Sequence, residues 1–181
     1  MPDHSTQRAD ARIRCARWVE LTTDELYEIV RLRNRVFALE QRVEAEDFDG
    51  RDRADETEHW WMPDEDGGVR AYLRLLRPAP DEVHPPDALP PRWVIGRVAT
   101  DPAFRGRGLA HGLVTAVLGR HGSEPMVLHA QEYVAGLYAA SGFVPFGESY
   151  DEAGIRHRGM YRAGQTAAQD PRSNKVEEGA R

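Results

Sequence analysis

The sequence predicts a single domain of the α/β or α+β class, in which helices sandwich a sheet. The apolar periodicity changes along the chain in the order strand, helix, three strands, helix, strand, helix and two strands. The length of 181 residues and the hydrophobic fraction of 40% suit one soluble domain with a sizeable core. Polar stretches bound this domain, so we expect residues 13–162 to fold and residues 1–12 and 163–181 to be disordered.

The first two elements are a strand and a helix. Ile13–Val19 has the composition of a strand, and Thr22 and Glu25 have the spacing of a capping box, which satisfies the first N–H groups of a helix. Apolar residues at intervals of three and four extend that helix to about Glu40. Its expected apolar face consists of Leu26, Ile29, Val30, Leu32, Val36, Phe37 and Leu39.

The middle of the chain predicts a hairpin, a loop and a central strand. Thr57–Met62 and Val69–Leu76 have strand composition and flank Asp64–Gly68, which is a turn sequence. Residues 77–92 contain six prolines and little apolar surface, which predicts a loop that borders the site. Trp93–Thr100 is the central strand.

The remaining elements alternate between helix and strand. A second helix ends near Gly119, and Met126–Ala130 has strand composition. Gln131–Ser141 is expected to be a short helix. Two last strands begin at Gly142 and Ile155 and are separated by an acidic, glycine-containing turn.

Composition and charge exclude several classes of protein. The net charge of -6 argues against nucleic acid as the main partner, because duplex binding requires a basic face. The sequence has no run of about 18 apolar residues that would span a membrane. The first residues lack the apolar core of a signal peptide, so we expect a cytoplasmic protein. The single cysteine, Cys15, has no partner for an internal disulfide and is expected to be a buried or half-buried strand residue.

A glycine-rich loop stands between the central strand and the second helix. Gly106 and Gly108 lack a Cβ, which lets the backbone adopt unusual φ angles and lets a ligand approach closely. The first N–H groups of the helix have no internal partner and carry the positive end of the helix dipole. Arg105 and Arg107 add positive charge. The pattern therefore predicts a phosphate-binding loop, with an ordinary glycine-rich surface turn as the alternative.

The kind of phosphate ligand follows from the spacing. No Lys follows the glycines, which argues against a nucleotide-hydrolysing P-loop. His111 stands where the dinucleotide fingerprint requires Gly or Ala. Arg105–Ala110 instead resembles the Q/R-x-x-G-x-G/A loop of the GNAT N-acetyltransferase superfamily, which binds the pyrophosphate of acetyl-CoA. Leu137–Phe143 resembles the L-Y-x-x-x-G-F signature of the same superfamily, and it lies at the expected distance along the chain.

More specifically, the chain resembles the ElaA subfamily over about residues 18–162. The similarity rests on Leu32–Gln41, Asp47–Gly50, Ile95–Val98, Ala130-Gln131 and Gly154–Met160. It implies the GNAT acyl-CoA N-acyltransferase fold, a central mixed and mostly antiparallel sheet flanked by helices. It also implies an N-acetyltransferase that uses acetyl-CoA as cosubstrate and acetylates a primary amine of a small molecule or peptide. A homodimer is a further expectation from the superfamily.

The resemblance also implies roles for individual residues. Backbone groups of the central strand, at Val98, Ala99 and Thr100, would bind the pantetheine arm and polarise the thioester carbonyl. Tyr138, expected near a helix start, would donate a proton to the departing thiolate, with a packed tyrosine as the alternative. Gln131 is a secondary cofactor contact. The pyrophosphate would bind at Arg105, Gly106, Arg107, Gly108, Leu109 and Ala110.

The general base stays open among Glu40, His59, His129 and His157, each on an element that can face the cleft. We favour His129, on the strand before the helix that carries Tyr138. Glu40 is alternatively a group that binds the amine as a cation.

An acidic stretch follows the first helix. Asp47-Phe-Asp49-Gly50 resembles the start of a calcium loop, but the intermediate ligands of an EF-hand are missing, so we predict no metal site. We interpret the stretch as a turn or a substrate-side loop whose carboxylates attract a cationic amine.

Two other classes of function are compatible with the sequence. A noncatalytic acyl-CoA-binding or regulatory module would retain the phosphate loop, but the signature around Tyr138 argues against it. An interaction protein would use the Trp60-Trp61 hairpin and the C-terminal tail as a partner surface. These two tryptophans are explained more simply as alternating core and surface residues of a strand.

Overall fold

The computed structural model describes residues 13–165 and contains one seven-stranded sheet in the order β1-β2-β3-β4-β5-β7-β6. The expectations for residues 1–12 and for the tail beyond 165 lie outside the described residues. The strands are β1 (Arg14–Arg17), β2 (Glu58–Pro63), β3 (Val69–Leu76), β4 (Trp93–Thr100), β5 (Met126–Gln131), β6 (Val144–Glu152) and β7 (Ile155–Arg162). The helices are α1 (Thr23–Arg33), α2 (Leu109–His121) and α3 (Ala135–Ala139).

The order of strands and helices along the chain agrees with the order predicted from periodicity. Neighbouring strands are antiparallel throughout the sheet except for β4 and β5, which are parallel. The sheet is therefore mixed and mostly antiparallel, as predicted. Among residues 13–165, no helix is both long enough and apolar enough to cross a membrane.

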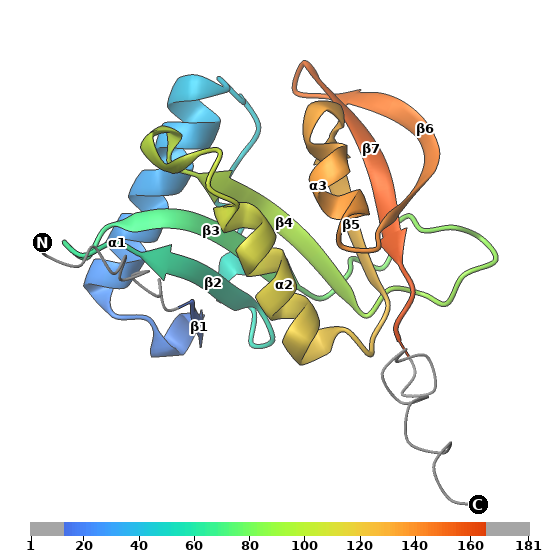
Figure 1. Ribbon diagram of the computed structural model, residues 1–181, viewed down its shortest axis with the longest axis horizontal. Helices are drawn as coiled ribbons and strands as arrows, with labels where there is room; N and C mark the ends of the chain where they lie inside the picture. Colours follow the sequence, from blue (N-terminus) through green and yellow to red (C-terminus); the bar gives the residue numbers. More distant parts are fainter. Residues whose placement is uncertain (1–12, 166–181) are drawn as a thin grey trace, which may run out of the picture.

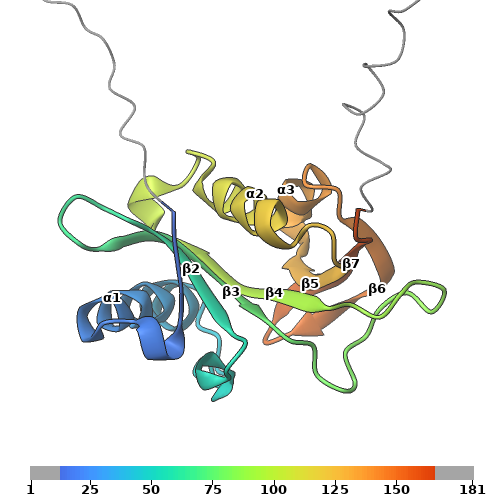
Figure 2. The same cartoon turned by 90° about the horizontal axis from the view of Figure 1, so that it is seen from below.

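Helices cover both faces of the sheet. Figure 2 shows α1 on one face and α2 with α3 on the other. The larger core lies under α2 and α3 and includes Trp60, whereas a second core under α1 includes Trp61. The expectation that these tryptophans alternate between core and surface is wrong. They do point to opposite faces, but both are buried because each face has its own helical layer.

The first helix begins as predicted and changes its winding near its end. The Glu25 N–H donates to Thr22 Oγ1 (3.2 Å) and the Thr22 N–H donates to Glu25 Oε2 (3.0 Å), which completes the capping box. Beyond Arg33 the helix continues to Glu40 with π-helical hydrogen bonds. Leu39, expected on the apolar face, is instead 68% exposed, because the wider turn no longer follows the 3.6-residue period.

The sheet splits between its two parallel strands. Pairing of β4 with β5 covers only Trp93–Ile95 and Met126–Leu128. Beyond this point β4 stays with β3, and β5 stays with β7, so the two strands diverge (Figure 1). Arg97 lies at a bulge in β4 with a φ of 52°, a left-handed conformation that bends the strand. The split opens the sheet at its centre.

Candidate active site

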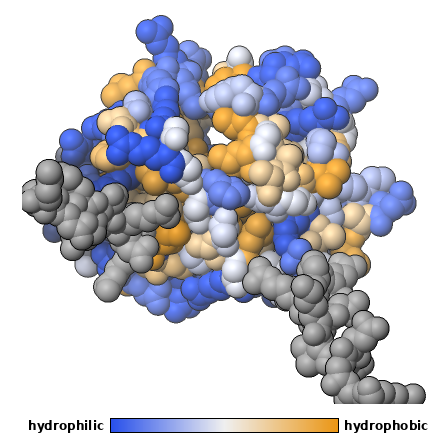
Figure 3. Space-filling view, viewed as in Figure 1, coloured by the Kyte–Doolittle hydropathy of each residue, from blue (hydrophilic) through white to orange (hydrophobic). Residues whose placement is uncertain are grey.

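A cavity of about 440 Å³ lies at the split in the sheet. This volume is in the range of small-molecule sites. Its walls come from both halves of the sheet, from α3, from the segment that follows α1 and from the proline-rich loop 77–92. Figure 3 shows the face that carries α2 and α3, where apolar side chains gather near its middle and the surface is hollowed between the loop before α2 and α3.

The loop between β4 and α2 presents a row of free backbone donors. Asp101 Oδ1 accepts a hydrogen bond from the Ala103 N–H (2.9 Å) and fixes the turn that follows the strand. Gly106 and Gly108 then adopt φ angles of 73° and 74°, which favour glycine. No residue of the described chain accepts a hydrogen bond from the six consecutive N–H groups of Gly106 to His111. Free donors at a helix N-terminus are an arrangement that suits an anion.

The two arginines of this loop differ in their partners. Arg105 donates to both carboxylate oxygens of Glu40, each at 2.7 Å. These hydrogen bonds lower the pKa of Glu40 and raise the pKa of Arg105. Arg107 donates to the carbonyl of Ala103 (3.2 Å) and its guanidinium lies over the ring of Phe104. Residues 105–110 lie next to the split but do not line the cavity itself.

Backbone groups of β4 face the gap between β4 and β5. The Asp101 N–H donates to the carbonyl of Arg70 in β3 (2.9 Å), and Ala99 pairs with Tyr72 in the same strand. Because backbone groups alternate along a strand, the carbonyls of Val98 and Thr100 point away from β3. Of the three predicted residues, Val98 lines the cavity, whereas Ala99 is buried against α1. The Thr100 carbonyl accepts a hydrogen bond from Arg105 Nε (3.3 Å).

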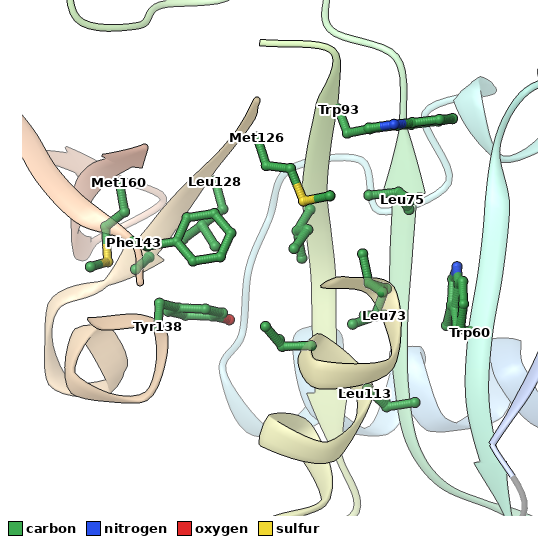
Figure 4. Close-up of a cluster of buried hydrophobic side chains, with 14 of the residues drawn as sticks. Trp60, Leu73, Leu75, Trp93, Leu113, Met126, Leu128, Tyr138, Phe143 and Met160 are labelled. Carbon is green, nitrogen blue, oxygen red and sulfur yellow. The ribbon is translucent and has the colours of Figure 1, made fainter. Parts of the chain in front are cut away.

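Tyr138 lines the cavity from the side of α3. Its ring packs edge-on against Phe143, and Figure 4 shows its hydroxyl directed away from Met160. That hydroxyl has no hydrogen-bond partner within residues 13–165, and burial raises its pKa, so it keeps its proton at neutral pH. Tyr138 lies near the end of α3, so the expectation of a position near a helix start is wrong.

His129 reaches the same cavity from the opposite face of the sheet. It is the first residue of β5 after the last pair with β4, and its neighbours Leu128 and Ala130 belong to the core that contains Tyr138. Its Nε2 lies 2.9 Å from Glu82 Oε1, and its Nδ1 lies 2.6 Å from the Tyr150 hydroxyl. The structure therefore brings together the predicted acid and the favoured base around one cavity.

The other candidate bases occupy different positions. His157 lines the cavity, and its Nδ1 lies 2.8 Å from the Ile155 carbonyl. His59 is buried away from the cavity, between the Tyr72 hydroxyl and the Asp52 carbonyl, and burial lowers its pKa. Glu40 does not line the cavity and is paired with Arg105.

Gln131 lies at the edge of the site, at the end of β5. Its Nε2 donates to Gln41 Oε1 (3.1 Å), and its Oε1 accepts from the Tyr133 hydroxyl (2.5 Å). Gln131 and Gln41 both line the cavity, so this bond joins β5 to the segment after α1 across the split.

The acidic stretch after α1 is held by arginines. Arg33, which is 1% exposed, binds Asp47 and Asp52. Arg74, which is 2% exposed, binds Asp49 through two hydrogen bonds of 2.8 and 2.7 Å. The arginines offset the charge of Asp47 and Asp49, and the expectation that the acidic stretch attracts an amine stays a prediction.

Arg97 completes this arrangement and leaves two other carboxylates free. Its Nε lies 2.7 Å from Asp47 Oδ1, so the bulge in β4 anchors the acidic stretch over the cavity. Glu46 and Glu152 line the cavity without an ion-pair partner in the described part of the chain. Across residues 13–165, no three His, Cys, Asp or Glu side chains converge so as to hold a metal ion.

The chain is similar in sequence to proteins of a known family. A family model described as "Acetyltransferase (GNAT) domain" matches residues 29–163. The chain belongs to the GNAT acetyltransferase family. It is 36% identical over 152 residues to a UPF0039 protein of Mycobacterium tuberculosis, covering 84% of this chain and 93% of that protein. It is 34% identical over 149 residues to Escherichia coli ElaA, covering 79% and 90%.

Solved structures of this GNAT family agree with the fold. A structure of an acyl-CoA N-acyltransferase from Pseudomonas aeruginosa has a TM-score of 0.71 and 36% identity, covering 84% of this chain and 99% of that chain. The structure of Escherichia coli ElaA has a TM-score of 0.71 and 32% identity, covering 83% and 98%. The GNAT fold and the ElaA-like assignment from the sequence are confirmed.

Two residues of the site, Glu82 and Tyr150, carry no sequence motif. Glu82 lies in the proline-rich loop that was expected to border the site, and it does line the cavity. Tyr150 reaches the cavity because β6 is irregular between Phe146 and Tyr150, where Gly147 has a φ of 64°. Such an irregularity has no signal strong enough to predict a single side-chain direction.

Proposed function

We propose that this GNAT protein transfers the acetyl group of acetyl-CoA to a primary amine of a small molecule or peptide, by direct attack within a ternary complex. One observation carries the proposal: the six free N–H groups from Gly106 to His111 lie at the N-terminus of α2, beside the open end of the split sheet. Backbone donors in this arrangement suit a diphosphate. Gly106 and Gly108 adopt left-handed conformations that favour glycine, so the loop depends on both residues.

The split in the sheet supports the placement of the thioester arm. A ligand arm that extends from the loop before α2 into the cavity would pass the edge of β4 that has no partner strand. Backbone groups of Val98 and Thr100 face this gap, and backbone groups at a strand edge bind an amide-containing arm in the manner of an added strand. An N–H at this edge would stabilise the oxyanion of the tetrahedral intermediate.

Tyr138 has the properties of the acid in this reaction. Its hydroxyl is protonated at neutral pH and has no protein acceptor in the described chain, so it is free to donate to a departing thiolate. The C–S bond breaks as the nitrogen takes the acyl carbon, and the electron pair left on sulfur accepts the tyrosine proton. The apolar surroundings of Tyr138 exclude water, which strengthens this hydrogen bond.

The free carboxylates suit an amine acceptor. Glu46 and Glu152 place negative charge on the cavity wall, and opposite charge raises the local concentration of a cationic substrate. An alkylamine is mostly protonated at neutral pH and must lose a proton before its lone pair attacks. The site therefore requires both an attraction for the ammonium form and a route for its proton.

Two measurements test the proposal. Calorimetry with CoA is expected to show binding, and free-thiol release from acetyl-CoA over a panel of primary amines is expected to show turnover. Binding of CoA without thiol release for any amine would favour the noncatalytic acyl-CoA-binding module. Failure to bind CoA at all would overturn the proposal.

A further inference from the structure

Three side chains from separate parts of the chain form a continuous hydrogen-bonded row along the cavity wall. Glu82 comes from loop 77–92, His129 from β5 and Tyr150 from β6. The His129 Nε2 lies 2.9 Å from Glu82 Oε1, and the His129 Nδ1 lies 2.6 Å from the Tyr150 oxygen. All three residues line the cavity that contains Tyr138.

The chemistry of the partners fixes the direction of each hydrogen bond. Hydrogen bonding to His129 lowers the pKa of Glu82, so Glu82 is ionised at neutral pH and only accepts. Nε2 of His129 therefore carries a hydrogen. In the neutral imidazole Nδ1 is then an acceptor, and the Tyr150 hydroxyl donates to it. The oxygen of Tyr150 keeps its lone pairs free for a donor in the cavity.

We propose that Tyr150 is the group that receives the proton of the acceptor ammonium and that it passes its own proton to His129, with Glu82 as the positioning residue. This inference rests on the proposed acetyltransfer. The N–H bond of the ammonium breaks and its electron pair stays on nitrogen as the nucleophile. That proton bonds to the Tyr150 oxygen while the Tyr150 proton moves to Nδ1 of His129. The imidazolium formed is stabilised by Glu82 and later releases its proton to solvent.

The arrangement of Glu82, His129 and Tyr150 resembles a catalytic triad, in which a carboxylate orients a histidine that is hydrogen-bonded to a hydroxyl. The carboxylate selects the tautomer and stabilises the imidazolium, and the imidazole accepts the hydroxyl proton. Here the hydroxyl relays a proton to the imidazole and does not itself attack. Burial raises the pKa of Tyr150 to about 12, so the phenol stays neutral before and after each transfer.

The backbone holds this row in place from two sides. Tyr150 pairs with His157 across β6 and β7, and their rings stack with centroids 6.0 Å apart. His129 pairs with Gly159. A Cβ at Gly159 would lie 2.6 Å from the Phe146 ring, so glycine is required for Phe146 to pack here.

The loop that carries Glu82 is also anchored. The Arg51 guanidinium donates to the Arg77 carbonyl (2.6 Å) at one end of the loop, and the Tyr161 hydroxyl donates to the Leu89 carbonyl (2.8 Å) near the other end. Six prolines restrict the loop further. These contacts hold the Glu82 carboxylate against β5, although loop 77–92 contains no helix or strand.

The charged and titratable groups around the row are few. Arg51 lies near Glu82, Glu152 lies near Tyr150 on the same strand, and His157 stacks on Tyr150 from β7. Glu152 also lines the cavity. It therefore places the ammonium form of an acceptor near the Tyr150 oxygen.

The first experiment reads the hydrogen bonds in the free protein by ¹⁵N NMR of the imidazole rings. We expect His129 to be the Nε2–H tautomer in the wild-type protein and in Tyr150→Phe, which keeps Glu82. In Glu82→Leu, which lacks the acceptor, we expect a mixture of tautomers. The Nδ1–H tautomer in the wild-type protein, or no change in Glu82→Leu, would overturn the proposal.

The second experiment uses an alkylamine found in the acceptor panel. Tyr150→Phe is expected to lower kcat about 100-fold at pH 7, a loss typical of removing an acid–base group. The KM for acetyl-CoA should not change. At pH 9.5 more of the amine is already neutral, so the loss is expected to shrink to about 10-fold. Tyr27→Phe, on the exposed face of α1, is the matched control. An equal loss at both pH values would indicate a purely structural role and overturn the relay.

The two experiments distinguish a failure of the proton relay from a failure of the proposed acetyltransfer. The tautomer of His129 is read without any acceptor, so it tests the row even if the protein acetylates no amine in the panel. Turnover by the wild-type protein with unchanged turnover by Tyr150→Phe would reject the relay and leave the acetyltransferase proposal standing.

Discussion

Glu40 holds Arg105 through two hydrogen bonds of 2.7 Å, although the two residues are 65 positions apart in the sequence. Glu40 ends the π-helical segment after α1, and Arg105 opens the loop with the free N–H groups. A carboxylate therefore occupies the guanidinium that a diphosphate at this loop would use. Gln41, the next residue, lines the cavity, so this ion pair connects the loop proposed to bind phosphate to the wall of the cavity.

Removing the Glu40 charge is expected to strengthen CoA binding. Glu40→Gln frees Arg105 and removes a negative charge near the diphosphate. An exposed ion pair is worth at most about 1 kcal/mol, so we expect the Kd for CoA to fall by about 2- to 5-fold at low salt and by less at high salt. Calorimetry at two salt concentrations measures this change. A fall in kcat of more than 10-fold would instead support the sequence-based prediction that Glu40 acts as a base.

The phosphate loop is tested by a change in backbone conformation. Gly108→Val places a β-branched residue at a φ of 74°, which L-residues avoid, and its Cβ would meet no protein atom within 4 Å. We expect the protein to fold and CoA affinity to fall at least 10-fold. Gly119→Ala, within α2 and also without a contact for its Cβ, is the control and should bind CoA normally. Normal affinity in Gly108→Val would contradict the loop assignment.

Tyr138→Phe is expected to lower kcat about 100-fold at saturating acetyl-CoA while leaving the Kd for CoA nearly unchanged. The hydroxyl has no hydrogen bond to lose within residues 13–165, so the substitution should not destabilise the core. Steady-state kinetics, calorimetry and thermal unfolding measure the three quantities. Unchanged turnover would leave Tyr138 as a packed aromatic residue only.

The arginine-bound acidic stretch predicts a loss of stability in acid. Burial opposes ionisation of Asp49, but hydrogen bonds from Arg74 outweigh it and lower its pKa to about 2. The unfolded value is about 3.9, so the stabilising contribution is complete above about pH 5 and is lost as the pH falls from about 4 to 2. Asp49→Asn is expected to destabilise by about 2 kcal/mol at pH 6 and by much less near pH 2. Urea unfolding at both pH values measures the difference, and a penalty independent of pH would contradict the assignment.

Local sequence patterns predicted the helices and strands because the start and periodicity of each element depend on residues close together in the sequence. The capping box at Thr22 and Glu25 needs only three residues of spacing, and the strand before Asp101 and the helix after Gly108 need only local periodicity. The burial of Trp61 was not predicted, since it depends on α1 crossing the second face. A strand pattern cannot show that its outward face is covered by another element.

The candidate site also contains residues that short motifs predict and residues that only distant contacts bring together. The phosphate loop and Tyr138 belong to short motifs, and the structure places Tyr138 on the cavity wall and leaves the N–H groups of the loop free. The partners of His129 come from residues 82 and 150, and no motif links them. Their meeting depends on a proline-rich loop and on an irregular strand, both of which are fixed by distant contacts.

The sequence by itself determined the order of the elements, the glycines of the anion loop and the tyrosine that follows it, because these depend on neighbours within a few residues. Tertiary structure alone decided that β4 and β5 separate after Ile95 and Leu128. It also decided that Arg33, Arg74 and Arg97 neutralise the acidic stretch, and that Glu82 and Tyr150 flank His129. These relationships join residues far apart in the chain, and only the packing of helices on both faces of the split sheet brings them within contact.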